Sequence, residues 1–86
     1  MPTISMFYGI VIRMFFNEHA PPHFHVEYGG KKAEVAIETL EVLAGGLPRR
    51  ALALVLEWAA QHRAELTADW ELCRRHQTPK RIEPLE

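Results

Sequence analysis

Cysteine is almost absent from this sequence, with a single residue, Cys73, among 86. A lone thiol excludes an intramolecular disulfide and is typical of proteins in a reducing compartment. Long hydrophobic runs are absent too, since no apolar stretch approaches the roughly 20 residues that a membrane-spanning helix requires. The first residues also lack the basic region and apolar stretch of a signal peptide. We therefore expect a cytoplasmic protein that does not enter a membrane.

An excess of charge of one sign is also missing. Ten Lys and Arg residues are opposed by eleven Asp and Glu residues, which gives a net charge of −1. The chain therefore has no overall cationic field, and a nucleic acid is a less favoured partner than a protein. At 86 residues the chain is too short for two domains, so we expect residues 1–86 to form a single one.

The first half of the chain, about residues 4–44, predicts antiparallel strands. Its segments are rich in β-branched and aromatic residues or alternate between polar and apolar side chains. The pair Gly29-Gly30 predicts a two-residue hairpin turn, because both glycines accept a positive φ. The expected strands cover residues 9–16, 23–28 and 31–37, with a shorter one at 40–43.

The predicted hairpin turn also sets the register of its two strands. Its cross-strand pairs match chemically: Phe24 with Val35, Val26 with Ala33, His25 with Glu34, and Glu27 with Lys32. On the first strand the alternate residues Ile10, Ile12, Met14 and Phe16 are expected on the apolar face. Arg13 then lies on the polar face, near Glu27.

The second half, about residues 48–76, predicts helix. Pro48 suits the first position of a helix. After it, residues expected on one face of the helix recur at spacings of three and four. The stripe consists of Leu52, Val55, Ala59, His62, Leu66, Asp69 and Cys73. Either one helix kinks near Glu65 or a second helix runs to about His76, and the proline-containing tail 77–86 is irregular. The fold class is therefore α+β, a three- to four-stranded antiparallel sheet packed against one or two C-terminal helices.

Three of the five histidines, His19, His23 and His25, lie within one short segment. Period-two geometry places His23 and His25 on the same face of a strand, with His19 in the preceding loop. Such a cluster can form a solvated strand face, a contact or acid–base surface, or a metal site. Because no third ligand at metal spacing is evident, we expect no tightly bound metal and no cofactor.

The segment and its predicted neighbours define a candidate binding surface. It consists of Arg13, His19, His23, His25, Glu27, Lys32 and Glu34. If the chain is an enzyme, its catalytic candidates are His19, His23, His25, Glu27 and Arg13.

Several segments carry a resemblance to a known family. In the first half they are MPTIS at 1–5, GIVIRMFFN at 9–17, HAPPHFH at 19–25, EY at 27–28, IETLE at 37–41 and LP at 47–48. In the second half they are EW at 57–58, HR at 62–63, WEL at 70–72 and IEPL at 82–85. With these motifs the chain resembles the domain of unknown function 4160 family, a group of small bacterial proteins without an established activity. The resemblance implies a small protein partner of family 2442, in an arrangement similar to toxin–antitoxin pairs.

Two functions from different classes fit these observations. We expect a non-enzymatic interaction module that pairs with another small bacterial protein in a regulatory or toxin–antitoxin-like unit; a homo-oligomer is a further arrangement that the sequence allows. The alternative is a small hydrolase, in one form directed at RNA, with the histidine cluster as acid and base and Arg13 or Lys32 steadying a phosphate. A concave site would favour the hydrolase, and a flat polar face would favour binding.

Overall fold

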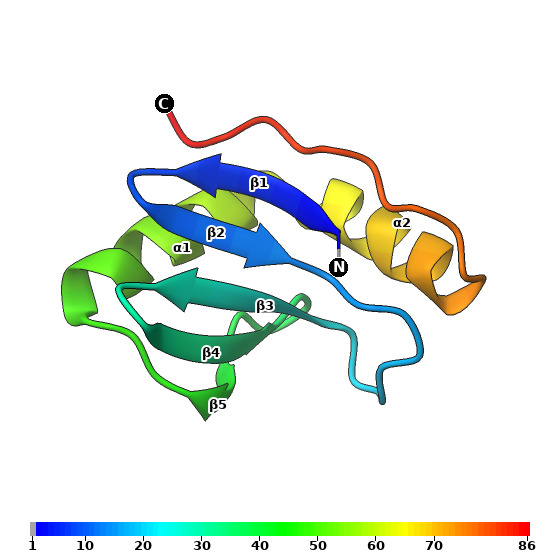
Figure 1. Ribbon diagram of the computed structural model, residues 1–86, viewed down its shortest axis with the longest axis horizontal. Coiled ribbons are helices and arrows are strands. Elements are labelled where there is room, and N and C mark those ends of the chain that lie inside the picture. The colour runs from blue at the N-terminus through cyan, green and yellow to red at the C-terminus, as the bar shows by residue number, and fades with distance from the viewer. Residues whose placement is uncertain (1) are drawn as a thin grey trace.

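Five strands come first along the chain and two helices follow in the computed structural model, which describes residues 2–86 (Figure 1). The strands are β1 (Thr3–Phe7), β2 (Ile10–Arg13), β3 (His23–Tyr28), β4 (Lys31–Ala36) and β5 (Val42–Gly45). The helices are α1 (Arg49–Gln61) and α2 (Arg63–Arg74). The α+β class is confirmed, and none of the described helices is long and apolar enough to span a membrane.

The strands form one antiparallel sheet in the order β1-β2-β3-β4-β5, one strand more than predicted. The additional strand is β1, which pairs with β2 across a turn at Tyr8 and Gly9, both at positive φ. The predicted strand over 9–16 corresponds to β2, which is shorter and ends at Arg13. β1 was not predicted, because the turn between β1 and β2 has no Asn-Gly or Gly-Gly signal to reveal it.

The register of the central hairpin is confirmed. β3 and β4 pair Phe24 with Val35, His25 with Glu34 and Glu27 with Lys32. Phe24 and Val26 are therefore turned to the core, and both are fully buried. The prediction placed Phe16 on the same apolar face, but it is 39% exposed, because β2 ends at Arg13 and the alternation ends with it.

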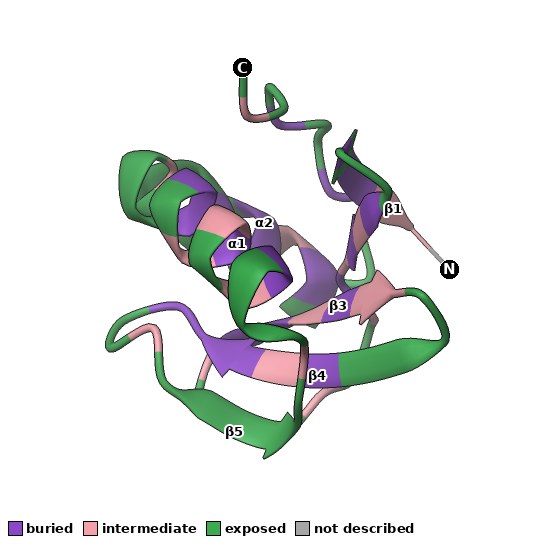
Figure 2. Ribbon diagram, turned by 90° about the vertical axis from the view of Figure 1, so that its left-hand side faces the viewer, coloured by how far each residue is buried: buried purple, intermediate pink, exposed green. Residues whose placement is uncertain are grey.

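The core lies between the sheet and the helices, as the buried side of each helix in Figure 2 shows. Trp58 of α1 is its centre: the ring is fully buried, 5.4 Å from the ring of Phe7 and 6.0 Å from that of Phe24. The two helices are separate, because His62 (φ −127°, ψ 26°) leaves helical geometry between them.

The C-terminal tail follows the outer side of β1 (Figure 1). The N–H of Ile82 donates to the carbonyl of Ile4 at 2.8 Å, and the indole N–H of Trp58 donates to the carbonyl of Glu83 at 2.8 Å. Ile82 is buried, so this irregular tail docks on the core. One edge of the sheet is thus covered by the chain itself, and β5 forms the other edge.

Candidate functional site

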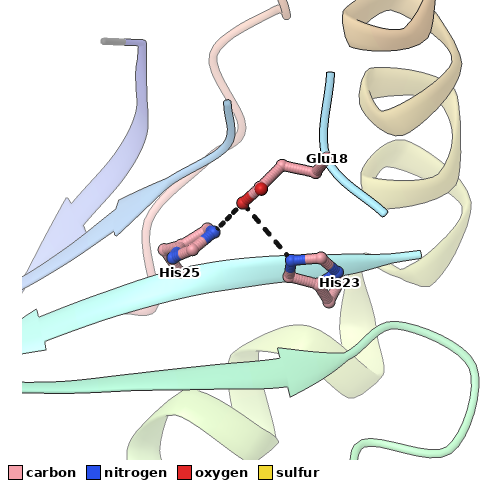
Figure 3. A group of neighbouring side chains, drawn as sticks. All are labelled: Glu18, His23 and His25. Carbon is pink, nitrogen blue, oxygen red and sulfur yellow. Dashed lines mark hydrogen bonds and ion pairs between the residues drawn. The ribbon is translucent and has the colours of Figure 1, made fainter. Parts of the chain in front are cut away.

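The strand β3, which carries His23 and His25, lies beside a loop on the polar side of the sheet. Residues 14–22 connect β2 to β3 and bring the carboxylate of Glu18 over β3 (Figure 3). His23 begins β3, and His25 lies two residues along it, on the face opposite Phe24. The site therefore combines two strand residues, whose positions the sheet sets, with one loop residue.

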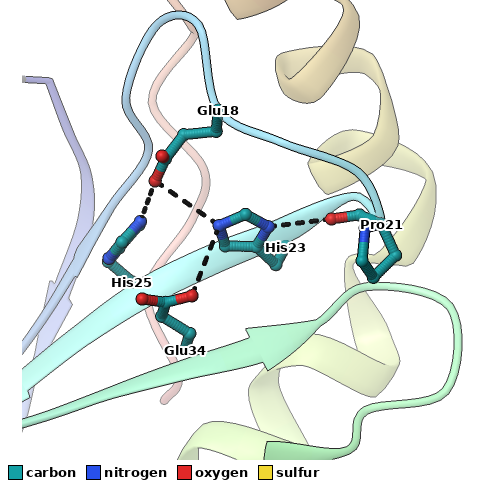
Figure 4. A network of polar contacts seen from close by, with 5 residues as sticks. All are labelled: Glu18, Pro21, His23, His25 and Glu34. Atoms are coloured by element: carbon teal, nitrogen blue, oxygen red, sulfur yellow. Dashed lines mark hydrogen bonds and ion pairs between the residues drawn. The ribbon is translucent and has the colours of Figure 1, made fainter. Parts of the chain in front are cut away.

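One oxygen of Glu18 is the centre of the cluster (Figure 3). Its Oε1 forms a hydrogen bond with Nε2 of His25 and lies 3.4 Å from Nε2 of His23. A second carboxylate, Glu34 of β4, has its Oε1 3.7 Å from the same His23 nitrogen (Figure 4). The ligand atoms of Glu18, His23 and His25 all lie within 4.8 Å of one another.

The orientation of the His23 ring is fixed by the backbone. Its Nδ1 lies 2.8 Å from the carbonyl oxygen of Pro21 (Figure 4). A carbonyl oxygen only accepts hydrogen bonds, so Nδ1 carries a proton and donates it. Nε2 is consequently the nitrogen that faces the carboxylates.

Aromatic rings support both imidazoles. The ring centroid of His23 lies 5.2 Å from that of Trp70 in α2, and the centroid of His25 lies 4.4 Å from that of Phe15. The two imidazoles are themselves 5.3 Å apart. His23 is only 6% exposed, so it is a buried member of the site rather than part of an open binding surface.

The environment of Glu18 favours its ionised form. Burial of the carboxyl raises its pKa, but its hydrogen bonds and electrostatic interactions with His25 and His23 lower the pKa by more. The net effect is a Glu18 pKa below its ordinary value. The cluster thus presents a carboxylate to two imidazoles, a set that can move a proton near neutral pH or hold a cation.

Arg13 and Glu27 form a separate pair. Nη1 of Arg13 donates to Oε2 of Glu27 at 2.5 Å, and both side chains are about one-third exposed. Their predicted proximity is confirmed. Because each neutralises the other, neither is a free charge for a ligand.

Two hollows flank Glu34. One of about 250 Å³ is lined by His25, Lys32 and Glu34 together with parts of β5. The other, about 350 Å³, is lined by Glu18, His19, His23 and Glu34 and reaches Leu43 of β5. His19 is exposed at the rim of the second hollow and is not one of the clustered ligand atoms.

The structure therefore divides the predicted surface. It gathers His23, His25 and Glu34, pairs Arg13 with Glu27, and leaves His19 and Lys32 at the rims. Glu18 was not among the predicted residues. Its one signal is a carboxylate in the loop ahead of the histidine pair, and no periodicity locates a loop side chain.

A family model described as Domain of unknown function (DUF4160) matches residues 9–71. The match includes Glu18, His23 and His25 and extends from the turn before β2 into α2. No curated protein matches the chain, and no solved structure does.

Proposed function

Since the chain belongs to the domain of unknown function 4160 family, whose description assigns no activity, we propose a function from its surface: a small interaction module that binds another small protein along β5. The observation that carries this proposal is the contrast between the two edges of the sheet. The tail covers β1, whereas within residues 2–86 no strand pairs with the outer side of β5. An unpaired edge strand is a template for strand addition by a partner.

The side chains on β5 support binding rather than solvation. Val42 and Leu43 are 39% and 42% exposed, on a strand whose residues are all exposed. Edge strands that avoid association usually carry Lys, Pro or another charged residue at such positions. Exposed aliphatic residues on a free edge therefore indicate a surface that a partner covers.

Hollows lie next to this edge. Leu43 borders the 350 Å³ hollow beside the histidine cluster and a larger one of about 480 Å³. The larger hollow is lined by Pro22, Ile37 and Leu43, together with two acidic residues, Glu38 and Glu41, and one basic residue, Arg63. The partner that fits is an extended segment with an apolar side chain for this hollow and basic residues beside the two glutamates. We propose that this segment belongs to a family 2442 protein, the partner that the resemblance implies, in a toxin–antitoxin-like unit.

Copurification from the native host followed by reconstitution tests this function. The protein that copurifies is identified, produced separately and titrated with the chain by calorimetry. We expect a one-to-one complex that Leu43→Lys weakens by at least about tenfold, because it places a charge where apolar contact forms. Met6→Lys is the matched control, since Met6 is an exposed hydrophobic residue on β1.

Two results would contradict the proposal. One is a reconstituted complex that Leu43→Lys and Met6→Lys weaken equally. The other is an isolated chain that forms a stable dimer in light scattering and loses it with Leu43→Lys, because the occupant of the edge is then a second copy.

The second candidate function, a hydrolase acting on RNA, is favoured by one observation. His25, held by Glu18, borders a hollow that it shares with Lys32, so a base and a cation lie at one concavity. Cleavage of a labelled RNA by the purified chain, lost in His25→Ala and retained in His76→Ala, would support the hydrolase. If the wild-type chain does not cleave the RNA, the hydrolase function is contradicted.

A further inference from the structure

The Nε2 atoms of His23 and His25 both face Oε1 of Glu18. For His23 this arrangement has an electrostatic consequence, since its only ring proton in the neutral form is on Nδ1 and is donated to Pro21. A neutral His23 would then direct an unshared electron pair at a carboxylate oxygen. Two acceptors in that position repel each other unless a positive species lies between them.

The distances indicate whether the positive species between His23 and Glu18 is a proton or a metal ion. A charge-assisted N–H···O bond is about 2.7–2.9 Å long. The separations from His23 Nε2 are 3.4 Å to Glu18 and 3.7 Å to Glu34, and both are longer. Two ligands of a tetrahedral ion, each about 2.0–2.1 Å from the metal, lie about 3.3 Å apart. The first separation therefore matches neighbouring ligands of one metal ion.

The sequence led us to expect no tightly bound metal because no third ligand was evident, and Glu18 is such a ligand. We propose instead that Glu18, His23 and His25 bind one divalent transition-metal ion, of the Zn²⁺ type, through a carboxylate oxygen and two imidazole nitrogens. Two histidines and one carboxylate are a donor set for zinc and for other first-row metals, whereas calcium and magnesium require oxygen ligands. Glu34 is a further oxygen donor nearby, since its Oε1 lies 3.7 Å from the same His23 nitrogen (Figure 4), and three protein ligands leave a fourth position unfilled. It is open to a water, to Glu34 or to an incoming ligand. The metal proposal does not rest on the partner proposed for β5, although Leu43 borders a hollow beside the site.

The surroundings of the ligands are those of a metal site. Metal-binding histidines usually donate the second ring N–H to a carbonyl or carboxylate, as His23 does to Pro21. Trp70 and Phe15 restrict rotation of the two rings. The imidazoles are thus oriented in advance, and little conformational freedom is lost on binding.

Glu18 is the ligand that must adjust. In the described structure its Oε1 forms a hydrogen bond with His25, and that contact has to open to admit an ion between them. Its side chain lies in the loop 14–22 and is one-quarter exposed, so it can turn without disturbing the sheet. The two nitrogen ligands stay in place on β3.

Charge and access are compatible with a cation. Arg13 lies opposite His25 in the β2–β3 pairing, but its charge is neutralised by Glu27. Glu18 and Glu34 supply negative charge on two sides of His23. The hollows that flank Glu34 connect the cluster to solvent and give an ion a path to it.

Calorimetric titration of the chelator-treated chain with Zn²⁺ tests the site. We expect one ion per chain with a Kd of about 1 μM or tighter. Glu18→Gln and His25→Ala should each weaken binding by at least about tenfold, since the first replaces a carboxylate ligand with a neutral amide and the second removes an imidazole ligand. His19→Ala is the matched control, because it removes a histidine from the same loop without removing a ligand. With Co²⁺ in place of Zn²⁺, the visible absorption of a four- or five-coordinate ion should appear in the wild type and be lost in Glu18→Gln.

The proposal is overturned by any of three results. These are no binding tighter than about 100 μM, binding that survives both Glu18→Gln and His25→Ala, and binding that His19→Ala abolishes equally. His23→Ala is not used alone, because the buried ring packs on Trp70 and its loss could unfold the chain. Glu18→Gln keeps the shape of a partly exposed loop residue, so its effect reports on the site itself, and circular dichroism checks the fold of each variant.

Discussion

The carbonyl oxygen of Lys32 lies 2.1 Å from the point that a Cβ on Gly45 would occupy. Gly45 also has a positive φ of 71°, a conformation that side chains disfavour. Its absent side chain lets the end of β5 approach β4 closely enough for the N–H of Gly46 to donate to Lys32 at 3.0 Å. The attachment of the edge strand thus depends on one glycine.

Gly45→Ala should therefore loosen β5. The methyl group meets backbone rather than a flexible side chain, so we expect a loss of about 2 kcal/mol or more in the free energy of unfolding. Gly46→Ala is the control, because nothing lies within 4 Å of its Cβ position. Urea denaturation measures the loss, and hydrogen exchange should show it concentrated in the β4–β5 pairing. Equal behaviour of the two variants would contradict this account.

The two faces of β3 should respond very differently to substitution. Val26→Asp places a charge at a fully buried position, and we expect a loss of several kcal/mol, enough to unfold the chain. Glu27→Gln, at the next residue, weakens only a partly exposed pair with Arg13 and should cost about 1 kcal/mol or less. Circular dichroism with chemical denaturation checks both values. Two equally mild variants would show that the faces are wrongly assigned.

Asp69 should make stability fall as the pH rises. Burial raises its pKa above the ordinary value of 3.8, as does the charge of Glu65, although the N–H of Lys80 donates to it and opposes the shift. Between 3.8 and the higher folded-state pKa, the native chain binds more protons than the unfolded one, so stability decreases with pH across that window.

The variant Asp69→Asn isolates this effect. It retains an oxygen acceptor for Lys80 and cannot ionise. The stability of Asp69→Asn relative to wild type should therefore increase as the pH rises from below 3.8 towards neutrality. Urea denaturation of both proteins at several pH values measures the difference. A difference that stays constant with pH would exclude a raised Asp69 pKa.

Cys73 should be an unreactive thiol in the native chain. It is 2% exposed, and burial together with the charge of Asp69 raises its pKa to about 11. Since the thiolate is the nucleophile, alkylation by iodoacetamide at neutral pH should be slow and should become fast in urea. Mass spectrometry of the alkylated chain measures both rates. Rapid labelling without denaturant would mean that α2 opens locally.

Much of the sheet was predictable because strand alternation and turn chemistry agree there. Gly29-Gly30 and the pairs Glu27–Lys32 and His25–Glu34 specify one register, and the structure has it. The strand β1 was missed because Tyr8 adopts a positive φ without belonging to the residues that usually do so. Phe16 was misplaced because alternation predicts a face only for as long as the strand continues.

The candidate site was only half predictable for a related reason. Period-two geometry brings His23 and His25 together from sequence alone. The position of Glu18 depends on the path of a loop, and the burial of His23 depends on Trp70 from a helix more than 40 residues away. Contacts of that kind arise from tertiary packing and leave no local pattern.

The strand order of the sheet is also the order of the chain, and this affects how the protein folds. Each strand pairs with the one made just before it, so the sheet can form through short loops with little entropy lost in closing them. The contact between Ile82 and Ile4 joins distant parts of the sequence and closes a much longer loop than the pairings between neighbouring strands. We expect rapid formation of the hairpins, with docking of the tail on β1 as the late step of folding.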